Sequence, residues 1–191
     1  MIVEIFAKLL KYSGLLAIIA FVSSVTISIS FNPWFSIFDN AFSELGGSKA
    51  YMPYIFNYGL IVFGSFILLF SIYAIIISNN KVETVSGGFM IIASLYFMLI
   101  GVFPHDFNPV WAHIFSALSS FLIAYLSVIV WGVGSIIGGK KKVGFILLIL
   151  SIFSPFAVAF FSLYSAAIVE SYGIFVLAVW IILLTFYQQP S

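Results

Sequence analysis

The chain has 191 residues, of which 63% are hydrophobic and only 7% charged, and its formal net charge is +1. Soluble proteins carry about 25% charged residues, so this composition excludes a soluble domain and predicts a membrane protein. The lack of a large basic cluster excludes nucleic acid as a partner, and the lack of cysteine excludes disulfides and thiolate chemistry.

Six apolar segments are each long enough to cross a bilayer, which takes about 20 helical residues. Their continuous apolar runs favour helices over a β-barrel, whose strands alternate in polarity. The predicted spans are residues 5–30, 53–78, 86–103, 109–138, 143–163 and 169–187. The first is read as an uncleaved span, because no small-residue cleavage pattern follows it. The sequence therefore predicts an all-α integral membrane protein, with residues 1–191 forming one six-helix bundle.

Two Asn-Pro pairs predict helix starts, because asparagine caps a helix and proline suits its first position. The pair at Asn32 and Pro33 predicts a short helix from Pro33 at the outer interface, between the first two spans. Gly46 and Gly47 would end it. The pair at 108–109 predicts that the fourth span begins at Pro109. Similar residues follow both pairs, which leaves an internal duplication open.

Lysine placement predicts the orientation of the bundle, because lysines are retained on the cytoplasmic side. With six spans, every lysine except Lys49 falls on one side. The lysines on that side are Lys8, Lys11, Lys81, Lys140, Lys141 and Lys142. The sequence thus predicts a multi-pass protein of the cell membrane with both termini in the cytoplasm.

Both histidines and most carboxylates fall on the opposite, outer side. They are Asp39, Glu44, Asp106 and Glu170, with His105 and His113. His113 lies one turn into the fourth span and heads a stripe of small residues at helical spacing. The stripe comprises Ser116, Ala117, Ser120, Ala124 and Ser127. Such stripes face other helices in membranes, so His113 is predicted to point into the bundle.

Ionisable groups gathered at one membrane depth suggest an acid–histidine site. In this hypothesis His113 acts as general base or ligand, and Glu44 and Asp106 orient it or bind a cation. The predicted substrate-binding residues are Asp39, Ser43, Asn57 and Glu170. Each of these residues also has a structural explanation, such as an interfacial helix, a packing seam or a helix N-terminus.

The same residue types could hold a divalent metal ion such as zinc, with an open position for water. The candidate ligands are His113, Glu44, Asp106, Glu170 and His105. However, the sequence contains no HExxH, GxSxG or phosphate-loop motif. Whether the protein is an enzyme is left open by these patterns.

Several motifs resemble the uncharacterised six-span membrane family catalogued as domain of unknown function 998. The matching positions are Ser43, Glu44, Leu45 and Gly46, then Gly101, Phe103, Pro104 and Asp106, then His113, and Glu170. The chain departs from that pattern at Ser171, where a basic residue is expected. More distantly, the layout is similar to the damage-regulated autophagy modulators and the glycosylphosphatidylinositol-lipid remodelling factors. The resemblance implies a six-span fold and, from the distant group, a lipid-related role.

Three functions remain open from the sequence. The outer cluster could bind or act on a lipid headgroup, with membrane lipids as partners. The chain could instead be a non-catalytic scaffold or accessory subunit that binds other membrane proteins or itself. A small-solute or ion transporter is the third, although the inner half offers few of the ionisable groups that a conduit requires.

Overall fold

The computed structural model describes residues 2–188, with side chains from residue 8 onward, and this part contains no β-strand. Its α-helices are α1 (Ile2–Phe31), α2 (Tyr54–Ile76), α3 (Lys81–Val102), α4 (Trp111–Ile137), α5 (Lys141–Phe161) and α6 (Ala166–Tyr187). A short 3-10 helix, η1 (Phe42–Gly46), lies between α1 and α2. All six α-helices have spans of 21 to 27 residues that are apolar enough to cross a membrane. The predicted all-α, six-span membrane fold is confirmed.

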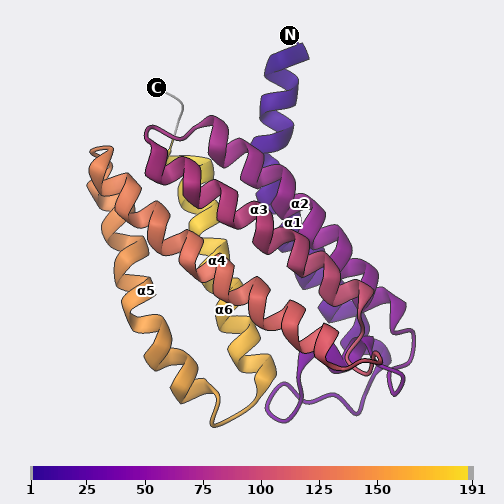
Figure 1. Ribbon diagram of the computed structural model, residues 1–191. Coiled ribbons are helices and arrows are strands. Elements are labelled where there is room, and N and C mark those ends of the chain that lie inside the picture. Colours follow the sequence, from indigo (N-terminus) through magenta and orange to yellow (C-terminus); the bar gives the residue numbers. More distant parts are fainter. Residues whose placement is uncertain (1, 189–191) are drawn as a thin grey trace.

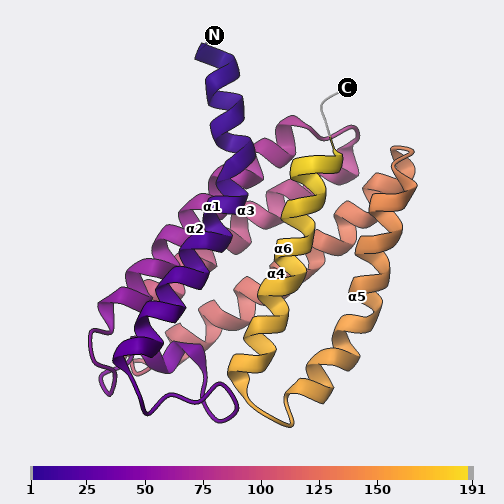
Figure 2. The same cartoon turned by 180° about the vertical axis from the view of Figure 1, so that it is seen from behind.

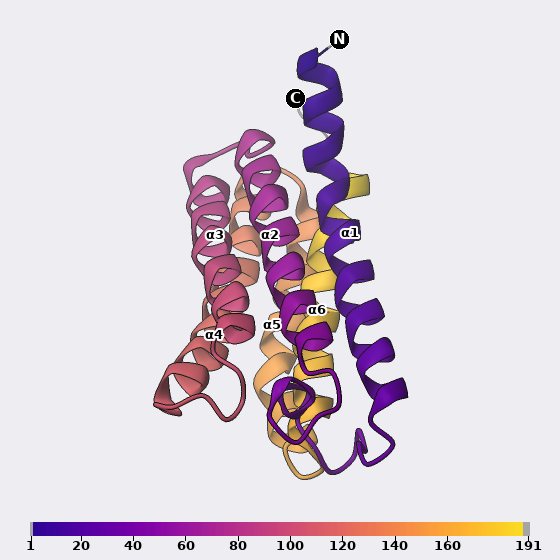
Figure 3. The ribbon, with the colours of Figure 1, turned by 90° about the vertical axis from the view of Figure 1, so that its right-hand side faces the viewer.

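The helices alternate in direction, so the bundle has two ends (Figure 1). One end, here named the lysine end, holds the α2–α3 and α4–α5 connections and the start of α1. The other, named the site end, holds the α1–α2, α3–α4 and α5–α6 connections. α1 extends beyond its neighbours at the lysine end (Figure 3). Six of the seven lysines thus share one end, while the side of the membrane that it faces stays a prediction.

Consecutive helices pack side by side from α1 to α6, and α6 also contacts α1 and α4 (Figure 2). One phenylalanine from each of α1, α2, α3 and α4 forms a continuous row of rings across the bundle. The centroid distances are 5.4 Å from Phe21 to Phe63, 5.0 Å from Phe63 to Phe97 and 5.5 Å from Phe97 to Phe121. Contacts at these distances are favourable aromatic packing, and the row crosses the site-end half of the bundle.

The predicted stripe on α4 is mostly buried, and Ser127 within it contacts α3. The hydroxyls of Ser86 and Ser127 each donate to the other residue's carbonyl oxygen, at 2.7 and 2.9 Å. Ser116 and Ser120 return their hydroxyls to α4 carbonyls and are 2% and 0% exposed. Small hydroxyl residues therefore bring α3 and α4 together, as expected in a membrane.

α5 is close to α4 at the lysine end only. A Cβ added at Gly144 would lie 2.6 Å from the carbonyl oxygen of Gly132, so only glycine permits this approach. Toward the site end, α4 and α5 diverge (Figure 1). The glycine contact therefore acts as the apex of a wedge whose wide part lies at the site end.

A short helix does lie between the first two spans, as predicted, but its predicted start at Pro33 is wrong. Residues 32–41 form turns, and the only helix in this loop is η1, which begins at Phe42. Asn32 does not cap a helix, because its side chain is buried and its Oδ1 accepts from the backbone N–H of Tyr51 at 2.7 Å. The chain is thereby folded back on itself before a helix can start. Gly46 and Gly47 do mark the end of η1.

The predicted span boundaries also differ from the structure by up to five residues. α3 begins at Lys81, five residues before the predicted start, because Asn80 caps the helix by accepting from the N–H of Glu83 at 3.0 Å. α4 begins at Trp111, two residues after Pro109. In α3 the capped first turn is polar, so hydropathy alone could not locate it.

Candidate functional site

The loop of residues 32–53 lies over the N-terminus of α6. The N–H of Ala167 donates to the carbonyl of Asn40 at 3.0 Å, and the hydroxyl of Ser165 donates to the carbonyl of Ile37. Ser165 also caps α6 by accepting from the N–H of Ile168 at 3.2 Å. These bonds satisfy groups that a helix end leaves unpaired, and they fix η1 beside α6.

Glu170 makes the third connection between this loop and α6. Its Oε2 accepts from the backbone N–H of Phe42, the first residue of η1, at 2.8 Å. No described residue donates to its Oε1. Glu170 therefore positions η1 with one oxygen and leaves the other available.

Asn57 holds η1 from the opposite side. Its Nδ2 donates to the carbonyl of Gly46 at 2.9 Å, which ties the end of η1 to α2. Asn57 thus has a structural role in the loop, and it does not line either of the cavities described below.

His113 is 6% exposed and lies in the first turn of α4. Its Nδ1 lies 2.7 Å from the carbonyl oxygen of Phe103, and a carbonyl can only accept a hydrogen bond. Nδ1 must therefore carry a proton, so the neutral ring has a bare Nε2 that can accept a proton or a hydrogen bond. The ring of His105 lies 5.6 Å away, centroid to centroid.

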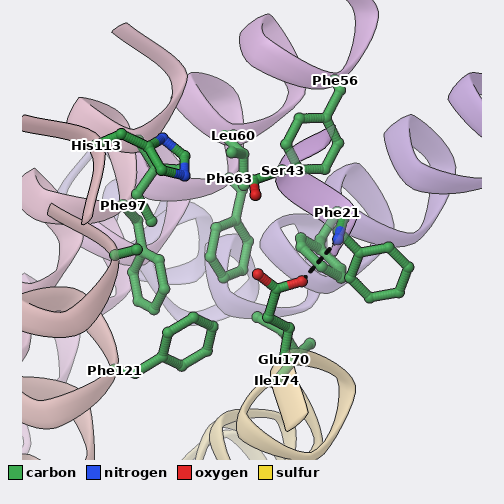
Figure 4. A pocket seen from close by; sticks show the side chains of 13 residues that line it. Phe21, Ser43, Phe56, Leu60, Phe63, Phe97, His113, Phe121, Glu170 and Ile174 are labelled. Carbon is green, nitrogen blue, oxygen red and sulfur yellow. Dashed lines mark hydrogen bonds between the residues drawn. The ribbon is translucent and has the colours of Figure 1, made fainter. Parts of the chain in front are cut away.

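A small cavity of about 30 Å³ lies between His113 and Glu170 (Figure 4). Its polar lining residues are Ser43, His113 and Glu170. The remaining lining is apolar and includes the four rings of the phenylalanine row. The cavity is thus mainly apolar, with three polar side chains at its surface and the phenylalanine row along its border.

A large cavity of about 660 Å³ lies between α4, α5 and α6. Its lining is mostly apolar, and its few polar side chains come from the site-end half of the three helices. Phe97, Ala117, Phe121 and Glu170 line both cavities, so they form a shared wall. The two cavities are therefore neighbours with mostly apolar linings, and Ser43 and His113 line only the small one.

The large cavity opens sideways, between α4 and α5. Leu118 and Leu122 on α4 line it and are nevertheless 68% and 60% exposed. Val158 on α5 also lines it and is 40% exposed. Because these residues lie on the flank of membrane-spanning helices, the opening faces lipid rather than water.

Two tyrosines hold α5 beside this opening. Pro155 has no N–H and leaves the carbonyl of Ser151, four residues earlier, without its helical partner. The hydroxyl of Tyr125 on α4 donates to that carbonyl at 3.1 Å. The hydroxyls of Ser154 and Tyr172, on α5 and α6, lie 3.0 Å apart. These side-chain bonds replace direct helix contact where the helices diverge.

The structure therefore brings Ser43, His113 and Glu170 together and leaves the other predicted site residues outside the cavities. Glu44 uses its carboxylate within its own loop, accepting from the N–H of Ala41 at 2.8 Å and from Asn40 at 3.0 Å. Asp39 is exposed at the loop surface.

Asp106 and His105 are exposed in the α3–α4 connection. Asp106 accepts from the N–H of Ser48 at 2.8 Å, and its hydrogen bonds with Ser48 hold the pKa of Asp106 below its ordinary value. His105 Nδ1 lies 3.1 Å from the hydroxyl of Ser43. No hydrogen bond joins Glu44 or Asp106 to His113, so an orienting role for these two carboxylates stays a prediction.

The predicted metal ligands are not assembled. In the part of the chain that the structure describes, no three histidine or carboxylate side chains converge as metal ligands. The physical reason is that each of the five candidates already has a hydrogen-bond partner in the protein. Glu44 is held by its own loop, Asp106 by Ser48, Glu170 by Phe42, His113 by Phe103 and His105 by Ser43.

Sequence reasoning missed the large cavity and the residues that frame it. Ser165 carried a readable signal, since a serine just before a helical apolar run is a typical N-cap. Pro155 inside an apolar run also predicts a helix irregularity. Tyr125 and Tyr172 carried no such signal, because an aromatic residue in a membrane span usually just fills space.

Comparison with known proteins supports the same architecture. Residues 15–187 match the family described as protein of unknown function (DUF998). No curated protein and no solved structure matches the chain at a significant level. The more distant resemblance to lipid remodelling factors stays a prediction. Because the match reaches from α1 to the last turn of α6, the chain belongs to the DUF998 family of membrane proteins.

Proposed function

We propose that this protein binds a membrane lipid, with an acyl chain in the large cavity and the head of the molecule at the small cavity. The observation that carries the proposal is that the two cavities are neighbours and share four lining residues, among them Glu170. An amphiphile has the same division, a long apolar part with a polar group at one tip.

The size of the large cavity supports a lipid occupant. Ligand sites typically have volumes of about 300–1,000 Å³, and a cavity of 660 Å³ lies well within that range. Its mostly apolar lining gains nothing from water, whereas an acyl chain would restore the contacts that the diverging helices lack.

The position of the opening supports entry from the bilayer. Exposed cavity-lining residues on α4 and α5 lie on the flank of the bundle, so a chain can enter without crossing an aqueous phase. The polar tip lies at the site end, close to the depth where lipid headgroups reside, because Glu170 and His113 are both within about a turn of their helix starts.

The two alternative functions have less support. A scaffold needs a polar cluster that is fully paired and closed, yet Oε1 of Glu170 and Nε2 of His113 have no hydrogen-bond partner among the described residues. A transporter needs a polar path toward the lysine end, yet the small cavity has a mainly apolar lining with the phenylalanine row along its border. Lipid binding uses both the unpaired acceptors and the apolar cavity.

Filling the large cavity tests the proposal. Ala124 lines this cavity on α4, and Ala124→Phe places a ring in the space of the acyl chain. The full-length protein is purified in mild detergent, and its bound lipid is counted by native mass spectrometry after addition of 1-monooleoylglycerol. We expect bound lipid in the wild type and a loss of at least about tenfold in affinity in the variant, because the two occupants exclude each other.

Ala159→Phe is the matched control. Ala159 lies on α5, is exposed and does not line either cavity. This variant keeps wild-type lipid binding if the cavity is the site. Equal binding by all three proteins, or equal loss in both variants, would contradict the proposal. Melting temperatures of the three proteins show whether Ala124→Phe remains folded.

A further inference from the structure

We propose that the head of the bound lipid is an uncharged group with a free hydroxyl, as in a monoacylglycerol or a long-chain alcohol, and that phosphate-bearing lipids are rejected. This inference rests on the proposed lipid-binding function and specifies the chemistry of its polar tip. It follows from three properties of the small cavity: its unpaired acceptors, its volume and the charge around it.

The small cavity offers acceptors that a hydroxyl can satisfy. Oε1 of Glu170 has no donor, and Nε2 of His113 is bare in the neutral ring because Nδ1 donates to Phe103. Figure 4 shows the Glu170 carboxylate and the His113 ring on opposite sides of the same space. A hydroxyl between them can donate to either group and can also accept from the hydroxyl of Ser43. A phosphate or carboxylate oxygen brings further acceptors and no donor.

The volume of the small cavity excludes a large headgroup. A water-sized group needs about 10–15 Å³ on this measure, so 30 Å³ has room for about two such groups. A hydroxymethyl group fits within that space. A phosphate ester, with four oxygens around phosphorus and its own hydration, does not fit without displacing η1 from α6.

The charge at the site end also opposes an anion. Four carboxylates lie at this end, those of Asp39, Glu44, Asp106 and Glu170, and the only lysine there is Lys49. The amine of Lys49 lies 4.4 Å from the ring centroid of Trp34 and is not a lining residue of either cavity. An anionic head in the small cavity would therefore add negative charge to an end rich in carboxyl groups, with no lysine among the lining residues of either cavity to offset it.

The experiment compares ligands that share one acyl chain and differ only in the head. The probes are 1-monooleoylglycerol, oleoyl lysophosphatidic acid and oleic acid, each titrated into the full-length protein in mild detergent and followed by native mass spectrometry. We expect the wild type to bind monooleoylglycerol at least about tenfold more tightly than either anion, as is typical when a buried site leaves polar groups unmatched by the wrong ligand.

Glu170→Gln changes the acceptor that faces the cavity. The amide oxygen can still accept from the N–H of Phe42, while the amide nitrogen then turns a donor toward the lipid. We expect the preference for monooleoylglycerol over lysophosphatidic acid to fall about tenfold in this variant. Glu44→Gln is the matched control, because Glu44 lies at the same end but uses its carboxylate within its own loop and lines neither cavity.

The outcomes separate this inference from the proposed function. Equal affinities for all three heads in the wild type, or tighter binding of an anion, would overturn the inference while leaving lipid binding intact if Ala124→Phe still abolishes binding. Binding of every probe that is unaffected by Ala124→Phe would overturn the proposed function itself. A wild-type preference that Glu44→Gln removes as fully as Glu170→Gln would also overturn the assignment of the head to Glu170.

Discussion

The two carboxylates held among the helices, Glu83 and Glu170, have opposite surroundings. Glu83 is 0% exposed, and both of its oxygens have partners: Oε2 accepts from the N–H of Asn79 at 2.7 Å and Oε1 from Ser135 at 3.3 Å. Glu170 has one oxygen on η1 and the other facing a cavity. A glutamate at the lysine end thus has both oxygens hydrogen-bonded, whereas a glutamate at the site end has one oxygen without a partner among the described residues.

The packing of α4 against α5 also differs between the two ends. At the lysine end, a Cβ on Gly134 would lie 2.7 Å from Cγ of Glu83, and Gly144 contacts the backbone of Gly132. Burial there lowers the pKa of Lys140, and the nearby charge of Glu83 opposes this shift. At the site end, α4 and α5 separate around the large cavity. A bundle closed at one end can therefore open at the other without losing its fold.

The largest expected effect is a loss of stability when the carboxylate of Glu83, which has partners for both oxygens, is removed. Glu83→Ala removes the acceptor for the N–H of Asn79 and for the buried hydroxyl of Ser135, and the loss of the two hydrogen bonds costs about 3 kcal/mol in total. For a chain of this size, that cost lowers the melting temperature by about 6–12 °C. Glu83→Gln retains an acceptor and is expected to lose less. Equal melting temperatures for the wild type and the Ala variant would show that the lysine end is not held by this residue.

The next largest effect tests the close contact between Gly144 on α5 and Gly132 on α4. Gly144→Val places a side chain against the Gly132 carbonyl and should cost about 1–3 kcal/mol through overpacking. Gly88→Val on α3 is the control, because a Cβ at Gly88 meets nothing within 4 Å. Both changes put valine in a helix, so a difference in melting temperature isolates the α4–α5 contact. A smaller drop in melting temperature for Gly144→Val than for Gly88→Val would contradict the close contact between α4 and α5.

The six-helix bundle could be predicted from the sequence because each helix is specified by the residues within its own span. Each span is an apolar run, and the inward face of α4 is visible as serines and alanines at helical spacing. The positions of Ser43, His113 and Glu170 at one end follow from counting spans. These three residues line one cavity, whereas Asp39, Glu44, Asp106 and His105 lie outside it, so the acid–histidine site stays a prediction.

The other features depend on tertiary structure and could not be read from local patterns. Asn32 looks like a helix cap, yet its partner is Tyr51, nineteen residues away. The large cavity exists because α4 and α5 diverge, and divergence is set by a glycine contact and by the hydroxyl of Tyr125 rather than by hydropathy. An apolar residue facing a cavity and one facing lipid have the same signature in a sequence.

A moderate effect is expected at the opening of the site end. Tyr125→Phe removes the donor to the Ser151 carbonyl that Pro155 leaves unpaired, which costs about 1 kcal/mol. Amide hydrogen exchange should therefore rise in α5 near residues 152–161 and stay unchanged near residues 144–150, where α5 contacts α4. Tyr164→Phe, at an exposed tyrosine in the α5–α6 connection, is the control. A uniform rise along α5 would mean that its two halves are not held differently.

The smallest expected effect concerns the contact between the two site-end loops, Asp106 and Ser48. Hydrogen bonds from Ser48 lower the pKa of Asp106 from its ordinary value of 3.8, because they favour the ionised carboxylate. A lowered pKa in the folded state means that the stabilisation is present above pH 3.8 and is lost as the pH falls through the lower, folded-state value. The proton chemical shift of the Ser48 amide, followed from pH 6 downward, should therefore change with a midpoint below 3.8 in the wild type and show no such step in Asp106→Asn. A midpoint at or above 3.8 would show that the hydrogen bonds from Ser48 do not favour the ionised form of Asp106, and that other contacts hold the two loops together.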